Sequence, residues 1–190
     1  MQPERVIRNR RVELDTWHFM DLPQSSPSPV GEGRVGISPS PLGEGRGEGP
    51  IVVPLATWKE HRDALLARTT PLGIWLKPDD DPAAIADDVH RFSLIAVHFP
   101  KFTDGRGYST AALLRTRYGY RGELRAFGDV GRDQLFYLAR CGFDSFRLAE
   151  HRDPEAALAS FGDFTVRYQG SVDDPVPLFR KRLATGGAQR

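Results

Sequence analysis

The segment 99–109 holds the densest group of side chains that could bind a ligand. Lys101 and Arg106 supply positive charge, and two nearby glycines let the backbone approach a bound group closely. The planar fork of an arginine guanidinium suits sulfate, phosphate or carboxylate. A helix that begins near Ser109 would direct its free backbone N–H groups toward the same point. The segment therefore predicts a site for a small oxyanion.

Neighbouring loops contribute further residues to this hypothesis. Asp104 lies in the same segment, and the stretch Gly128–Gln134 has the composition of a strand-to-helix turn. Arg132 could converge on the oxyanion, but the arginines could equally pair with nearby aspartates and only stiffen the loops. Asp129 could act as a general base, although a helix N-cap is the more ordinary role. The candidate anion-binding residues are Lys101, Asp104, Arg106, Ser109, Asp129 and Arg132.

Other chemistries have weaker support. His98 could transfer protons near neutral pH, but a hydrogen-bonded structural histidine is the more ordinary explanation. The run Asp79–Asp81 lacks the alternating ligands of an EF-hand, so we assign it to capping the next helix and predict no metal site. Cys141 has no nearby histidine and should be buried and inert. The sequence contains no dinucleotide-binding, P-loop or nucleophile-elbow motif. It therefore identifies neither catalytic residues nor a cofactor.

Short apolar runs of strand length alternate with helical patterns from Ile51 onward. The runs are Ile51–Leu55, Leu72–Leu76, Leu94–Phe99, Glu123–Phe127 and Ser145–Leu148. Strands that are apolar on both faces need cover on both faces, which indicates a parallel sheet built from βαβ units. About five such units fall short of a complete eightfold barrel. We therefore expect an α/β fold with a mostly parallel sheet, either open or a partial TIM-like barrel.

Sequence signals also mark where several helices begin. Asp81-Pro82 and Asp153-Pro154 each combine an N-cap with a proline at the first helical position. Thr57, with a glutamate three residues later, fits a capping box. Because the C-terminal ends of parallel strands meet at one edge of a sheet, the loops that carry the candidate anion-binding residues should lie together there.

The N-terminal part of the chain has a different character. Arg5–Ile7 and Val12–Phe19 flank a polar tetrapeptide and predict a β-hairpin, with Trp17 packed against the main domain. Residues 22–50 contain SPSPVGEGR and, twelve residues later, SPSPLGEGR, a proline- and glycine-rich repeat that favours disorder. The expected organisation is a hairpin over 1–21, a disordered insertion over 22–50, an α/β domain over 51–179 and a flexible basic tail over 180–190.

Composition limits the class of protein. A chain of 190 residues suits one main domain, and 26 basic against 25 acidic residues argue against a polybasic nucleic-acid binder. No apolar run approaches the roughly 20 residues of a membrane span, and the first residues lack the apolar core of a secretory signal. A single cysteine excludes an internal disulfide framework. We expect a cytoplasmic protein without nucleic-acid or membrane partners.

Three stretches, GIWLKPDDDP, FPKFTDGRGYS and LLRTRYGYRGELRAFGDVGRDQLFYLARCGFDSF, resemble an uncharacterised bacterial family of small cytoplasmic proteins. Members are typically encoded beside assimilatory sulfite reductase and are often labelled oxidoreductases. The resemblance covers about Ile51–Phe179 and is most specific over Phe99–Phe146, whereas the repeat at 22–50 departs from the family pattern. It implies no particular catalytic residue.

The resemblance implies a pathway and leaves the activity open. The first expectation is an accessory protein or oxidoreductase of assimilatory sulfate and sulfite reduction that binds a small oxyanion at the C-terminal edge of the strands. The first alternative is a non-catalytic module that docks on sulfite reductase. The second is a flavin- or nicotinamide-dependent enzyme, although no dinucleotide fingerprint supports it.

Overall fold

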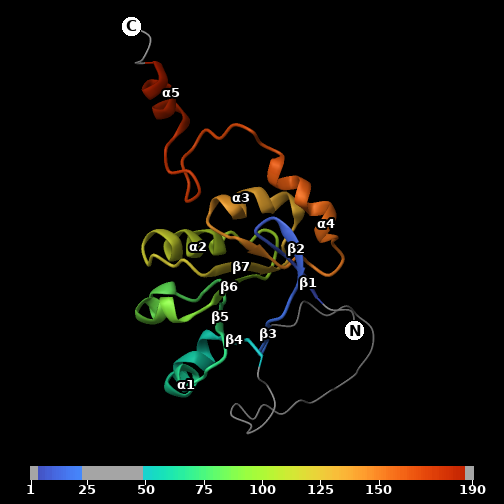
Figure 1. Ribbon diagram of the computed structural model, residues 1–190, viewed down its shortest axis with the longest axis vertical. Helices are drawn as coiled ribbons and strands as arrows, with labels where there is room; N and C mark the ends of the chain where they lie inside the picture. The colour runs from blue at the N-terminus through green and yellow to red at the C-terminus, as the bar shows by residue number, and fades with distance from the viewer. Residues whose placement is uncertain (1–3, 23–48, 187–190) are drawn as a thin grey trace.

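A computed structural model describes residues 4–22 and 49–186, and its body is an eight-stranded sheet with helices packed on one face (Figure 1). The strand order is β2-β1-β8-β7-β6-β5-β4-β3. The repeat that predicts disorder lies almost wholly in 23–48, outside the described residues, so the disorder stays a prediction.

The strands and helices of the body alternate along the chain. The strands are β4 (Ile51–Pro54), β5 (Leu72–Leu76), β6 (Leu94–Phe99), β7 (Glu123–Gly128) and β8 (Ser145–Phe146). The connecting helices are α1 (Leu55–Leu66), the 3-10 helix η1 (Pro82–Arg91), α2 (Arg106–Thr116), the short 3-10 helix η2 (Arg132–Gln134) and α3 (Leu135–Arg140). After β8 come α4 (Pro154–Ala157) and the 3-10 helix η3 (Leu158–Gly162).

These five strands are parallel and adjacent in chain order. Successive connections in one direction place the helices that connect these strands on the same face, and the sheet curls away from them as half of a barrel. The expectation of a mostly parallel sheet is therefore confirmed, and of the two forms expected, an open sheet or a partial barrel, the structure has the partial barrel.

The two faces of the sheet bury different side chains. Ile74, Ile95 and Leu124 belong to the larger core, which the helices cover. The inner face of the curl buries a smaller cluster made by Val52, Trp75, Leu94, Ala96 and Phe127. Both faces are covered, as runs of apolar strand residues require.

The N-terminal hairpin is confirmed, with a correction to its second strand. β1 (Arg5–Arg8) pairs antiparallel with β2 (Arg11–Leu14) across a two-residue turn in which both residues have positive φ. The expected strand Val12–Phe19 is wrong, because β2 ends at Leu14. A separate strand, β3 (His18–Phe19), pairs with β4 at the opposite edge of the sheet.

Residues 15–17 therefore cross from one edge of the sheet to the other over its inner face. Trp17 packs on the inner cluster together with Phe19 and Leu22, as expected for Trp17. This crossing segment covers apolar surface on the face opposite the connecting helices.

The predicted helix starts are partly correct. Asp81 accepts a hydrogen bond from the Ala83 N–H at 2.9 Å, and Asp153 accepts one from the Glu155 N–H at 3.2 Å, so both caps are confirmed. The capping box at Thr57 is wrong. The helix α1 follows β4 without a loop, its N-cap is Pro54, and no side chain caps it.

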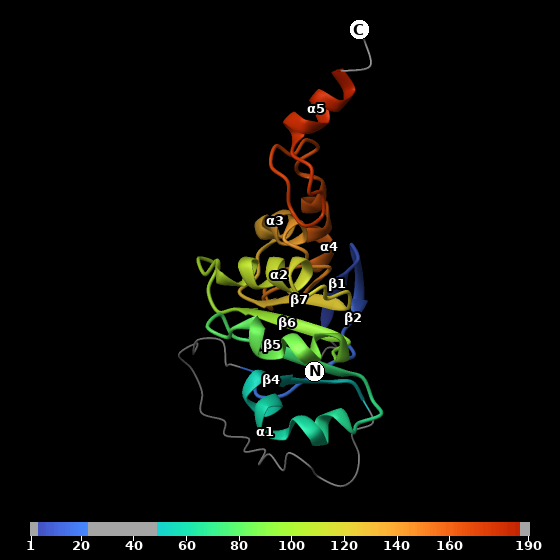
Figure 2. The same cartoon turned by 90° about the vertical axis from the view of Figure 1, so that its left-hand side faces the viewer.

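The C-terminal part of the chain leaves the body and ends in helix α5 (Leu178–Gly186), which projects away from the sheet (Figure 2). The expected flexible tail at 180–190 overlaps this helix, and residues 187–190 lie outside the described part of the chain. Among the helices of the described residues, none is both long enough and apolar enough to cross a bilayer.

Candidate functional site

The loops that follow β5 and β6 meet at the C-terminal edge of the sheet through Arg106. Arg106 is the first residue of α2, and its guanidinium forms a bidentate ion pair with the Asp104 carboxylate. Its Nε lies 3.0 Å from Oδ1 and its Nη2 lies 2.6 Å from Oδ2. The remaining nitrogen, Nη1, contacts the carboxylate of Asp79 from the loop after β5. We call Asp79, Asp104 and Arg106 the rim cluster.

The charges of the rim cluster compensate one another. Hydrogen bonding from Arg106 lowers the pKa of Asp104 to about 2, and Asp104 in turn raises the pKa of the guanidinium. Two carboxylates face one guanidinium, although the arginine side chain is still 54% exposed. An incoming oxyanion would have to displace a carboxylate. The geometry thus favours the alternative in which the arginine stiffens the loops.

His98 stands beside the rim cluster on the inner face, at the end of β6. Its half-buried ring lies 5.0 Å from the ring of Phe127 and 6.2 Å from that of Trp75. Burial lowers the pKa of His98, the charge of Asp104 opposes this shift, and that of Lys77 adds to it. A neutral imidazole packed between aromatic rings fits the structural role better than the catalytic one.

The backbone next to His98 requires glycine. Gly128 ends β7 with φ +104°, and a Cβ atom there would lie 2.3 Å from the Phe99 carbonyl oxygen and 2.9 Å from His98 Cδ2. The absence of a side chain lets β6 and β7 keep their register up to the rim, where Phe99 pairs with Gly128.

Among the described residues, the side chains of the other predicted anion-binding residues form no ion pair or hydrogen bond with the rim cluster, although the Asp104 N–H donates to the Lys101 carbonyl at 3.0 Å. The side chains of Lys101 and Ser109 are exposed. Arg132 donates from Nε to Ser160 Oγ at 3.2 Å, toward η3. The two arginines of the hypothesis thus have different partners, and a shared oxyanion site stays a prediction.

Asp129 has a loop-bracing role that differs from the expected one. Its Oδ2 accepts a hydrogen bond from the Phe102 N–H at 2.9 Å, which ties the loop after β6 to the end of β7. The helix N-cap expected at Asp129 is wrong, because the N-cap of η2 is Gly131. The N–H of Gly131 donates to the side chain of Gln134 at 2.8 Å, so a side chain three residues later replaces the cap.

A buried ionic cluster on the inner face was missed by the sequence analysis. Arg125, in the middle of β7, is fully buried and lies 2.7 Å from Asp15 and 2.7 Å from Glu123. Its Nε also donates to Ser145 Oγ at 3.1 Å. The signal in the sequence is a lone arginine between the apolar residues of the run Glu123–Phe127. Because carboxylates occupy its donors, we assign this arginine to fold stability.

A second feature that the sequence analysis missed is an exposed apolar surface after η3. We call it the C-terminal surface, and its residues are 45% to 71% exposed: Phe164, Val166, Tyr168, Val176 and Phe179. Contacts with α3 hold this stretch to the body. Phe164 packs on Phe136 at 4.9 Å between ring centroids, and the Val172 N–H donates to the Arg140 carbonyl at 3.1 Å.

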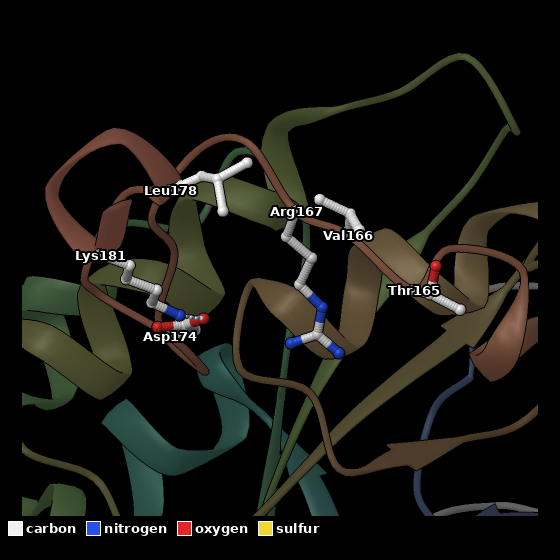
Figure 3. A pocket seen from close by; sticks show the side chains of 6 residues that line it. All are labelled: Thr165, Val166, Arg167, Asp174, Leu178 and Lys181. Atoms are coloured by element: carbon white, nitrogen blue, oxygen red, sulfur yellow. Dashed lines mark hydrogen bonds and ion pairs between the residues drawn. The ribbon is translucent and has the colours of Figure 1, made fainter. Parts of the chain in front are cut away.

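A shallow pocket of about 290 Å³ lies within this region (Figure 3). Its walls come from the stretch 165–167, from Asp174 in the loop before α5 and from the start of α5: Thr165, Val166, Arg167, Asp174, Leu178 and Lys181. Two ion pairs support the walls, Arg167 with Asp173 and Lys181 with Asp174. The hydrogen bond from Lys181 lowers the pKa of Asp174, which stays ionised. Apolar groups and ion-paired charged groups of both signs thus line one hollow.

In the described part of the chain, no group of three or more His, Cys, Asp or Glu side chains is arranged to hold a metal ion. Cys141 is buried, as expected, and its burial raises the pKa of the thiol. A thiol that stays protonated is a poor nucleophile and a poor ligand.

Comparison with known proteins yields one family. A family model described as "Bacterial protein of unknown function (DUF934)" matches residues 73–179, more than half of the chain. The matched part begins in β5, includes the rim cluster and ends at Phe179, at the start of α5. No curated protein and no solved structure matches the chain. By this match, the chain belongs to the bacterial family DUF934, whose function is unknown.

Proposed function

We propose that this chain is a non-catalytic accessory protein that acts by docking on another protein. The observation that carries the proposal is the C-terminal surface, where apolar side chains remain 45% to 71% exposed. Soluble monomers rarely leave a contiguous apolar patch uncovered, and covering it yields about 25 cal/mol per Å² of apolar area.

The proposed partner is the assimilatory sulfite reductase of the same organism. This choice rests on the sequence resemblance to a family encoded beside that enzyme, and on no contact in the structure. The rim cluster supports a docking role rather than a catalytic one, because Asp79 and Asp104 already occupy the guanidinium of Arg106.

The docking proposal is tested with the full-length chain and purified sulfite reductase. We expect a complex in size-exclusion chromatography with light scattering, and a Kd in the micromolar range or below. The double variant Val166→Ser/Tyr168→Ser should weaken it at least about tenfold, which corresponds to about 1.4 kcal/mol. Leu14→Ser on β2 is the matched control, because Leu14 is 58% exposed and lies outside the C-terminal surface. The absence of any complex contradicts the proposal.

The assigned pathway is tested separately in cells. A strain that lacks the gene is grown with sulfate, sulfite or sulfide as the sulfur source. An accessory role in sulfite reduction predicts poor growth on sulfate and on sulfite and normal growth on sulfide. Normal growth on all three sources contradicts the assignment.

A second candidate function is oxyanion binding at the rim. The observation that favours it is Arg106, whose side chain is 54% exposed in the first turn of the eleven-residue helix α2. Calorimetric titration with sulfite, sulfate and phosphate should show binding to the wild type that is lost in Arg106→Ala. Arg117→Ala, at the other end of α2, should bind like the wild type. Indistinguishable titrations of wild type and Arg106→Ala eliminate this function.

A further inference from the structure

Positive charge is concentrated in the segment that carries the C-terminal surface. Residues 164–186 contain four basic and two acidic side chains, although the whole chain is almost balanced at 26 to 25. Three of the four basic residues are consecutive in α5, at 180–182, and that helix contains no acid. Phe179, which is 49% exposed, precedes them, and the guanidinium of Arg180 lies 5.9 Å from its ring centroid. Apolar and basic groups therefore share one end of the molecule.

We propose that the C-terminal surface binds an acidic protein surface, with Phe179 as an apolar anchor and Arg180 of α5 pairing with a carboxylate. This inference rests on the proposed docking role and adds the chemistry of the partner. Aromatic residues and arginine carry much of the binding energy in protein interfaces, and arginine pairs with carboxylates through two parallel hydrogen bonds. Opposite charges on the two partners also accelerate their encounter.

The attachment of the segment to the body suits it to docking. Arg140 of α3 holds it on one side, since its carbonyl accepts a hydrogen bond from Ser171 Oγ at 2.7 Å and its Nε lies 3.6 Å from Asp173. Beyond this anchor α5 stands clear of the sheet in both views (Figures 1 and 2). The Leu178 N–H donates to the Tyr168 carbonyl at 3.1 Å, so α5 and the stretch before it are linked. A partner would meet a surface that is largely formed in advance, which lowers the entropic cost of binding.

The pocket beside α5 could receive a side chain of the partner. Val166 and Leu178 supply its apolar part, whereas Lys181 at its wall is already paired with Asp174 and Arg167 with Asp173 (Figure 3). An apolar partner side chain therefore matches the Val166 and Leu178 part of the pocket. The hollow of about 290 Å³ exceeds what one side chain needs, so neighbouring partner atoms would fill the rest.

Two other occupants fit less well. A bilayer surface would bring Asp173 and Asp174 toward anionic headgroups, and Asp174 is held in its charged form. A second copy that used the same surface would place two basic α5 helices against each other, which costs free energy through like-charge repulsion. A folded protein can place its carboxylates opposite Arg180 and away from Asp173 and Asp174, which a uniform layer of anionic headgroups cannot do, and it brings no second basic α5 helix.

The test replaces Phe179 by the photo-crosslinking residue p-benzoylphenylalanine in the full-length chain, expressed in its own host. After irradiation, mass spectrometry identifies the crosslinked peptide. We expect a segment of another protein in which Asp and Glu outnumber Lys and Arg. The crosslink yield should fall at least about tenfold when Arg180→Glu is added and stay unchanged with Arg117→Glu. Circular dichroism checks that both charge-reversal variants are folded.

The outcomes separate this inference from the proposed function. No crosslink, a crosslink to a second copy, a basic or neutral target segment, or a yield insensitive to Arg180→Glu overturns the inference. So does co-sedimentation of the chain with phosphatidylserine vesicles that Arg180→Glu abolishes. An acidic target on a protein other than sulfite reductase supports the inference and removes the proposed partner. A crosslink to sulfite reductase outside any acidic segment supports the proposed partner and overturns the inference of an acidic target.

Discussion

Asp15 and Arg125 are 110 positions apart in the sequence, yet the Asp15 carboxylate lies 2.7 Å from the Arg125 guanidinium in the interior of the protein. The two side chains are 2% and 0% exposed. Arg125 projects from β7 onto the inner face of the sheet, and Asp15 belongs to the segment that crosses this face. The pair therefore fastens the N-terminal crossing to the middle of the sheet.

Removing one member of this pair should destabilise the protein strongly. Asp15→Ala leaves the buried guanidinium with fewer partners, and we expect the free energy of unfolding to fall by about 3–5 kcal/mol. Urea denaturation monitored by tryptophan fluorescence measures the loss. The control Arg62→Ala breaks an ion pair between the exposed Arg62 and Asp88 and should have a much smaller effect. Equal losses in the two variants would mean that the buried pair has no special role.

Gly128→Ala should be far more harmful than Gly119→Ala. Both glycines have positive φ, but a Cβ atom at 128 would lie 2.3 Å from the Phe99 carbonyl oxygen, whereas one at 119 has nothing within 4 Å. We expect a loss of about 1 kcal/mol for Gly119→Ala and about 3 kcal/mol or more for Gly128→Ala. Thermal and urea unfolding of the two variants measure the difference. Similar losses in the two variants would show that the close approach of β6 and β7 does not exclude a side chain at position 128.

The pKa of His98 should respond in opposite directions to two neighbouring substitutions. The negative charge of Asp104 raises this pKa and the positive charge of Lys77 lowers it, while burial has the largest effect and lowers it. Asp104→Asn should therefore lower the pKa of His98 further below 6.5, and Lys77→Gln should raise it. Titration of the imidazole signals by NMR measures both shifts. Shifts in the same direction would contradict the arrangement of charges around the ring.

The rim cluster should make stability depend on acid pH. The pKa of Asp104 falls from 3.8 to about 2 in the folded protein because Arg106 binds the ionised carboxylate. The folded state then binds fewer protons than the unfolded state, so this contribution to stability is present above pH 3.8 and is lost as the pH falls toward 2.

Arg106→Gln should return the pKa of Asp104 toward 3.8, and carbon-detected NMR of the carboxyl group measures this shift. The variant should also lose the pH-dependent contribution of Asp104 to stability. Arg117→Gln serves as the control and should leave the titration of Asp104 unchanged. A carboxyl that titrates near its ordinary value in the wild type would contradict the pairing.

The body of the fold could be predicted because its signals are local. Apolar runs such as Leu72–Leu76 predict strands that are covered on both faces, and in the structure every residue of this run is buried. The Asp-Pro pairs at 81–82 and 153–154 cap helices through hydrogen bonds that span two residues. Adjacent parallel strands then follow from the regular alternation of strand and helix.

What the sequence could not provide depends on long-range contacts. A two-residue strand such as β3 has no periodicity, so its pairing with β4 leaves no trace in the pattern. The contact of Arg106 with Asp79 depends on how close two loops come, and that distance is set by strand register. Tyr168 and Phe179 are exposed, yet an apolar residue in a sequence looks the same whether a core or a partner will cover it.

The strand order has a consequence for folding. Both outermost strands, β2 and β3, come from the first nineteen residues, and β1 pairs with β8 across most of the chain length. Until the N-terminal segment pairs with them, β4 and β8 therefore expose unpaired backbone groups, which promote aggregation. Because these last contacts join distant positions, we expect the closing step to be slow. A chain that lacks the first nineteen residues would keep these unpaired backbone groups and should aggregate more readily.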